Sequence, residues 1–147
     1  MKEIKIAIGS DHAGYNLKEK VKKYLIEKQI VFEDFGPFSE DRTDYPDFAH
    51  AVAVAIERKK ADLGILICGS GNGINMAANK HQEIRSALCW REDIAEMARL
   101  HNDANIIALP ARYIEESVAL GCVDVFLKTE FEGGRHAFRV NKISCQE

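Results

Sequence analysis

Short apolar runs alternate along the chain with longer segments in which apolar residues recur at helical spacing. Five runs have the length and composition of strands, at residues 4–8, 30–35, 63–67, 85–89 and 105–109. The segments between and after them predict helices over residues 15–28, 48–59, 92–100 and 113–127, with another helix directly after the third strand. Strands that alternate with helices indicate a parallel sheet that is covered by helices on both faces.

The predicted fold class is therefore α/β, a Rossmann-like three-layer α/β/α sandwich around a five-stranded parallel sheet in the order 2-1-3-4-5. No repeat, low-complexity tract or linker interrupts the pattern, so residues 1–147 are assigned to a single domain. In this order strands one and three are neighbours, and a crevice forms at their carboxyl ends. Asp11 and His12 follow the first strand and Cys68 follows the third. We expect these three side chains to meet in that crevice.

The stretch from Leu63 to Lys80 organises the chain. An apolar strand ends at Cys68, three glycines follow at positions 69, 71 and 73, and good helix formers close the stretch. The glycines allow the backbone to approach a ligand closely, and the first helical turn directs free N–H groups at it. Such a place favours the thiolate of a cysteine and stabilises a developing oxyanion.

A purely structural interpretation of this stretch is also open, because glycine-rich turns and buried cysteines are common. Two nucleotide-binding motifs fail on spacing. No Lys-Ser or Lys-Thr pair completes a Walker A loop, and Ile74 stands where a dinucleotide fingerprint requires its third glycine. The loop suits a small anion better than a nucleotide.

Composition narrows the class of protein. The 147 residues are 46% hydrophobic and 29% charged, with a net charge of -3, which argues against a general nucleic-acid binder. No apolar run approaches the roughly 20 residues of a membrane span, and the N-terminus lacks the pattern of a signal peptide. Four cysteines without C-x-x-C spacing indicate reduced thiols in the cytoplasm. The five histidines are scattered, so neither a metal site nor a cofactor is expected.

Two further polar clusters carry alternative interpretations. Residues 101–105, His-Asn-Asp-Ala-Asn, have the composition of a helix end and turn. Arg135 and Arg139 follow two glycines and, in a helix, would share one face as a phosphate clamp, or simply form a solvated basic turn. This tail, about residues 128–147, lies beyond the last predicted helix. We expect it to contact a neighbouring subunit in a dimer with shared sites.

The chain resembles the type B ribose-5-phosphate isomerases and the wider family that includes galactose-6-phosphate isomerase subunits. The resemblance covers nearly the whole chain and is carried by six motifs, at residues 9–14 (GSDHAG), 42–47 (RTDYPD), 67–73 (ICGSGNG), 77–80 (AANK), 101–105 (HNDAN) and 132–136 (EGGRH). It implies a metal-free aldose–ketose isomerase that acts on a phosphosugar. It also implies a homodimer or a pair of dimers.

The resemblance implies roles for individual residues. Cys68 matches the base that moves the proton between C2 and C1, and Ser70 the hydroxyl near O1 and O2. His101 matches the ring-opening histidine, which the other subunit contributes. The sugar contacts that it implies are Asp11, His12, Asn102 and the loop residues Gly69, Gly71, Asn72 and Gly73. The phosphate contacts that it implies are His12, Arg112, Arg135 and Arg139.

Three residues depart from the family pattern, and these departures bear on which substrate the protein uses. Asn72 stands where an apolar residue is expected, Asn75 where serine is common, and Pro110 where glycine is frequent. The two asparagines either face the sugar or cap the helix. The expected reaction is the interconversion of ribose 5-phosphate and ribulose 5-phosphate. The alternatives are isomerisation of a six-carbon phosphosugar, such as allose or galactose 6-phosphate, and a non-catalytic phosphosugar-binding module.

Overall fold

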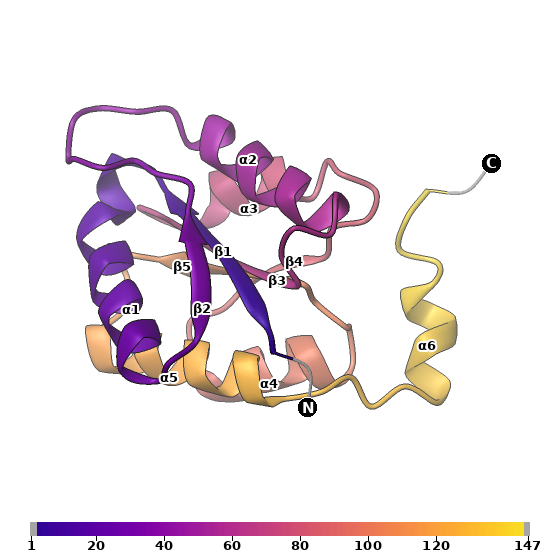
Figure 1. Ribbon diagram of the computed structural model, residues 1–147. Coiled ribbons are helices and arrows are strands. Elements are labelled where there is room, and N and C mark those ends of the chain that lie inside the picture. Colours follow the sequence, from indigo (N-terminus) through magenta and orange to yellow (C-terminus); the bar gives the residue numbers. More distant parts are fainter. Residues whose placement is uncertain (1–2, 146–147) are drawn as a thin grey trace.

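The computed structural model describes residues 3–145, so the two residues at each end, which belong to the predicted domain and tail, lie outside the described residues. Five strands form one parallel sheet (Figure 1): β1 Lys5–Ser10, β2 Val31–Asp34, β3 Leu63–Cys68, β4 Ser86–Leu88 and β5 Ile106–Pro110. The helices are α1 Tyr15–Glu27, α2 Tyr45–Glu57, α3 Asn72–Ala78, α4 Glu92–Leu100, α5 Glu116–Lys128 and α6 Arg135–Val140. These elements confirm the predicted α/β class.

Two apolar layers enclose the sheet. On one face α2 and α3 pack through residues such as Val52 and Ile74, and on the other α1, α4 and α5 pack through residues such as Val21, Ala95 and Phe126. β3 and β5 are buried along their whole length, as expected for strands covered on both faces. The three-layer prediction is therefore confirmed.

The predicted order of the last two strands was wrong. The sheet runs β2-β1-β3-β5-β4, so that β5 rather than β4 pairs with β3. The reason is burial: β5 is five fully buried residues, whereas β4 has only three, two of them half-buried. A short, partly exposed strand is suited to the edge of a sheet. The β1–β3 neighbourhood, on which the predicted crevice depends, is unchanged.

α6 stands apart from the three layers (Figure 1). It follows Gly133 and Gly134, whose φ angles of 72° and 56° turn the chain before the helix begins. The helix carries Arg135 and Arg139 one turn apart, as predicted, and both side chains are exposed. Its inner residues His136 and Val140 are buried.

Candidate active site

Cys68 and Asp11 lie side by side at the carboxyl ends of β3 and β1. Ser10 is in register with Ile67, and the Asp11 N–H donates to the Ile67 carbonyl over 3.1 Å. Asp11 is itself buried, and its Oδ1 accepts from the Gly14 N–H at 3.0 Å, which begins one turn of 3-10 helix at His12–Gly14. The predicted meeting of the ends of strands one and three is confirmed.

Cys68 is only 4% exposed, and its surroundings differ from those that the sequence predicted. Burial raises the pKa of the Cys68 thiol, and the charge of Asp11 raises it further, although the backbone N–H groups of Ile74, Gly71 and Ser70 favour the thiolate. The expectation of a lowered pKa was wrong because the loss of hydration outweighs these three N–H groups. The thiol is thus neutral in the free protein at neutral pH.

The glycine loop folds tightly around this end of β3. Gly71 has a φ of 77°, and a Cβ there would lie 2.5 Å from Leu88 Cδ1, so neither the conformation nor the space suits another residue. A Cβ on Gly73 would lie 2.5 Å from the Tyr45 ring, and one on Gly69 would lie 3.1 Å from Arg112 Nη1. These close approaches place Tyr45 and Arg112 against the loop.

Asn72 begins α3 but does not cap it. The N-cap position is Gly71, no side chain makes a capping hydrogen bond there, and the Asn72 N–H donates to Ser70 Oγ at 3.2 Å. The exposed Asn72 side chain instead lines a shallow depression of about 460 Å³, together with Ser70, Leu88, Trp90, Pro110 and Tyr113. Of the two roles considered for Asn72, this position favours contact with a ligand.

A buried ammonium group anchors the loop that precedes α2. Lys18, on α1, is fully buried and donates to both Asp34 oxygens at 2.7 and 2.8 Å and to the Pro37 carbonyl at 2.6 Å. Further along this loop, Thr43 Oγ1 accepts from the His12 N–H at 2.9 Å. The loop is thereby held against the turn that carries His12, at the same edge of the sheet as Cys68.

The remaining predicted residues lie at the other end of the strands, on the amino-terminal side of the sheet. His101 and Asn102 precede the amino end of β5, whereas Cys68 pairs with Pro110 at its carboxyl end. The five residues of β5 span four steps of about 3.3 Å each, so the two ends of the strand are roughly 13 Å apart. Arg135 and Arg139 are on the side of His101, because the His136 ring stacks on the His101 ring at 4.2 Å. One chain therefore does not bring all the predicted residues together.

Sequence reasoning missed three residues of these surroundings. Tyr45 lies over the glycine loop, while Glu132 and His136 gather around His101, with His101 Nε2 3.7 Å from a Glu132 oxygen. The RTDYPD and EGGRH motifs contain all three, so a signal was present. Among the described residues, His101, Glu132 and His136 have nitrogen and oxygen atoms close enough together to hold a metal ion. The scattered spacing of the histidines had argued against such a group.

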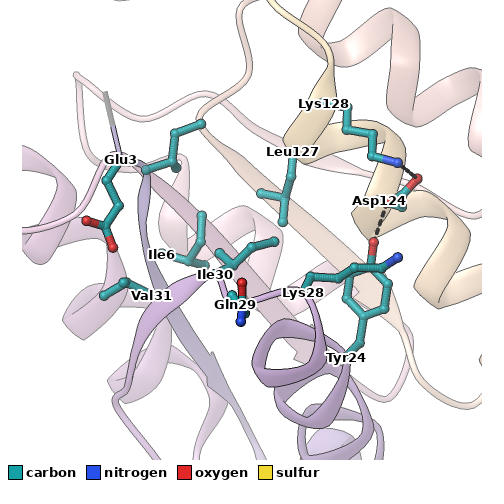
Figure 2. Close-up of a pocket in the computed structure, with 11 residues that line it drawn as sticks. Glu3, Ile6, Tyr24, Lys28, Gln29, Ile30, Val31, Asp124, Leu127 and Lys128 are labelled. Atoms are coloured by element: carbon teal, nitrogen blue, oxygen red, sulfur yellow. Dashed lines mark hydrogen bonds and ion pairs between the residues drawn. The ribbon is translucent and has the colours of Figure 1, made fainter. Parts of the chain in front are cut away.

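An apolar pocket of about 350 Å³ lies elsewhere, between the ends of α1 and α5 and the amino ends of β1 and β2. Figure 2 shows Leu127, Ile30 and Ile6 around it and the Tyr24 hydroxyl bonded to Asp124. It is far from the glycine loop in the fold and contains none of the predicted site residues.

In the part of the chain that the structure describes, no helix is long and apolar enough to span a membrane.

Comparisons with known proteins agree with this architecture. The family model described as Ribose/Galactose Isomerase matches residues 6–143. Ribose-5-phosphate isomerase B of Escherichia coli is 43% identical over 143 residues, which cover 97% of this chain and 96% of that protein. A ribose 5-phosphate isomerase structure from Thermotoga maritima is 52% identical with a TM-score of 0.95, over 97% of this chain and 99% of that one.

A solved structure from Mycoplasma genitalium adds a ligand to these comparisons. It is described as ribose-5-phosphate isomerase B with bound ribulose-5-phosphate. It is 43% identical with a TM-score of 0.92, and the match covers 97% of this chain and 95% of that one. The similarity extends over the whole fold, including both groups of predicted site residues.

Proposed function

Because this chain belongs to the ribose/galactose isomerase family, we propose that it interconverts ribose 5-phosphate and ribulose 5-phosphate, with Cys68 as the base. The observation that carries the choice of base is the position of Cys68. Its sulfur lies at the carboxyl end of a central strand, beside Asp11, with the N–H groups of Ser70, Gly71 and Ile74 directed at it. A base and oxyanion donors are the two requirements of the reaction.

The chemistry follows from the acidity of a carbon next to a carbonyl. The Cys68 thiolate removes the proton from C2 of the open-chain aldose, and the electron pair forms the C1–C2 double bond while O1 becomes an oxyanion. A proton passes from the O2 hydroxyl to the O1 oxyanion. The same thiol then returns its proton to C1, and the electron pair on O2 forms the new C2 carbonyl. A well-placed general base contributes about 10²–10⁴-fold, and one oxyanion donor roughly 10²–10³-fold. In this proposal Ser70 and the loop from Gly69 to Gly73 bind the oxygens at C1 and C2.

The phosphate end and the ring-opening step require a second chain. Arg112 lies against Gly69 beside Cys68, but Arg135, Arg139 and His101 are at the other edge of the sheet. We therefore extend the proposal to a homodimer. In each of its sites Cys68, Asp11, His12, Asn72 and Arg112 of one chain would face His101, Asn102, Arg135 and Arg139 of the other. Four free cysteines fit a reducing compartment, so we place the enzyme in the cytoplasm.

The test is turnover of ribose 5-phosphate by the purified chain, with deuterium incorporation at C2 as the readout for the base. We expect Cys68→Ser to lose at least about 10²-fold in both measurements, in line with the loss of a general base. Cys145→Ser, which changes an exposed thiol, is the matched control and retains activity. Wild-type exchange in Cys68→Ser would remove Cys68 from the mechanism.

Substrate comparison decides between the proposed reaction and its alternatives. We expect kcat/KM to be higher for ribose 5-phosphate than for allose or galactose 6-phosphate. Asn72 in the open depression is the feature that favours a longer sugar, so the six-carbon substrates are assayed with Asn72→Ala as well. Binding of all these phosphosugars without turnover of any would indicate a non-catalytic binding module.

A further inference from the structure

Three potential metal ligands converge where α4 ends. The ligand atoms of His101, Glu132 and His136 all lie within 4.8 Å of one another. His101 Nε2 is 3.7 Å from Glu132 Oε2, and the two imidazole rings stack 4.2 Å apart with 15° between their planes. Two imidazoles and a carboxylate are a ligand set that proteins use for zinc, with water at the fourth position.

The backbone holds this trio together. The His101 N–H donates to the Met97 carbonyl at 2.9 Å, which keeps His101 at the end of α4, and the Glu132 N–H donates to the adjacent Leu100 carbonyl at 3.0 Å. Gly133 and Gly134 then reverse the chain so that His136 returns over the His101 ring. Ligands that are far apart in the sequence are thus brought together by two fixed segments.

One atom of the trio has no partner in the structure. His136 is 8% exposed, and its Nε2 is buried without a hydrogen bond. A neutral imidazole has a lone pair available for a metal ion. A buried polar atom without a partner calls for a ligand or solvent.

A second trio of the same residue types provides a contrast. His50 Nδ1 lies 2.7 Å from His81 Nε2, and His81 Nδ1 lies 2.9 Å from Glu57 Oε1. These groups satisfy one another as a hydrogen-bonded chain across α2 and the segment after α3. Only the trio at the end of α4 combines converging ligand atoms with an unsatisfied one, among the residues that the structure describes.

We propose that His101, Glu132 and His136 form a binding site for a divalent transition-metal ion, with Zn²⁺ as the preferred ion. Zinc ligands at about 2.1 Å stand about 3.4 Å apart in a tetrahedral site. The exposed Glu132 side chain and the half-buried His101 ring can rotate to close the present spacing. Imidazole nitrogen also favours zinc over magnesium or calcium.

The consequence for activity rests on the proposed function, in which His101 opens the sugar ring. A bound Zn²⁺ occupies the imidazole nitrogen that this step needs. Zinc is therefore a reversible inhibitor of turnover of the ring-closed substrate, and a chelator restores activity. The bound metal ion regulates the proposed enzyme by blocking His101 and takes no part in the isomerisation itself.

The experiment is a calorimetric titration of the full-length dimer with Zn²⁺, in a Cys145→Ser background that removes the exposed thiol. We expect one high-affinity Zn²⁺ per chain. Both His136→Ala and Glu132→Gln weaken its binding at least about tenfold, the smallest loss seen for outer-shell changes in metal sites. His81→Ala, in the second trio, is the control and leaves the affinity unchanged. Glu132 is exposed, so the Glu132→Gln variant tests the site even if His136→Ala fails to fold.

Equal affinity in the Glu132→Gln variant and its parent would overturn the site, as would loss of binding in His81→Ala. A parallel assay of ribose 5-phosphate turnover with and without Zn²⁺ separates the two proposals. Zinc binding that depends on Glu132 in an inactive protein would contradict the proposed function alone. Full turnover without zinc binding would contradict the metal site alone.

Discussion

At the residue scale, opposing electrostatic effects act on the pKa of the Cys68 thiol. Burial and the carboxylate of Asp11 raise its pKa, while three backbone N–H groups lower it, and the first two dominate. The base of the proposed reaction is consequently protonated for most of the time in the free protein at neutral pH. A base of this kind reacts faster as the pH rises, because the thiolate fraction increases until the pH passes the raised pKa.

Alkylation measures this pKa directly. We expect iodoacetamide to modify Cys68 at a rate that still rises above pH 8.5, the ordinary pKa of a cysteine. Asp11→Asn removes a negative charge near the sulfur, so the midpoint of the rate profile shifts to lower pH. The reaction is followed by mass spectrometry of the Cys68 peptide in Cys145→Ser protein.

Glu92→Gln is the matched control for this charge change. Its carboxylate raises the pKa of Cys122, on the other face of the sheet, so its loss leaves the Cys68 profile unchanged. A midpoint that stays in place in Asp11→Asn would show that Asp11 does not influence the thiol.

At the scale of elements, the turn between β3 and α3 determines which N–H groups face Cys68. Gly71 adopts a left-handed conformation at the start of α3, and a Cβ atom on this residue would lie 2.5 Å from Leu88 Cδ1. The turn is therefore constrained twice, by backbone conformation and by packing against β4. Neither constraint applies to the surface of the loop, where Ser70 and Asn72 are exposed.

Replacement of two glycines separates these constraints. Gly71 and Gly133 both have positive φ, 77° and 72°, but a Cβ at Gly133 meets nothing within 4 Å. We expect Gly133→Ala to lower the free energy of unfolding by about 1–2 kcal/mol, the cost of the left-handed conformation. Gly71→Ala adds a steric clash of about 1–3 kcal/mol and also lowers kcat. Urea denaturation followed by circular dichroism gives both values, and equal losses would refute the packing argument.

At the scale of the whole molecule, the proposed catalytic groups are split between the two ends of the parallel strands. Cys68, Asp11 and Arg112 are at the carboxyl ends, and His101 with α6 is on the side of the amino ends. α6 stands away from the three layers, in a position from which it can contact a second chain (Figure 1). A symmetric dimer in which each chain donates α6 to the other would complete two sites at once.

Complementation between inactive chains tests this arrangement. Cys68→Ser and His101→Asn chains are each expected to be nearly inactive on ring-closed substrate. Half of the dimers formed by co-refolding them are mixed, and each mixed dimer has one site with both native residues, so about a quarter of wild-type activity should return. Mixing Cys68→Ser with Cys68→Ala chains is the control and restores nothing. Sites that lie within single chains would give no recovery in either mixture.

The sequence by itself determined the class of fold, the position of the glycine loop and the family. Apolar periodicity located the strands and helices, because burial on a sheet or a helix face imposes a fixed spacing. The adjacency of Asp11 and Cys68 also followed from sequence, because parallel strands that are neighbours present their carboxyl ends at the same edge. The six motifs added roles that no spacing rule supplies.

Only the tertiary structure decided the remaining features. Burial depends on every layer that covers a residue, so the order of β4 and β5 and the raised pKa of Cys68 were not readable from local pattern. The convergence of His101, Glu132 and His136 depends on how α4 and the segment before α6 meet. Contacts between segments distant in the chain arise from packing, which a linear spacing of residues does not encode.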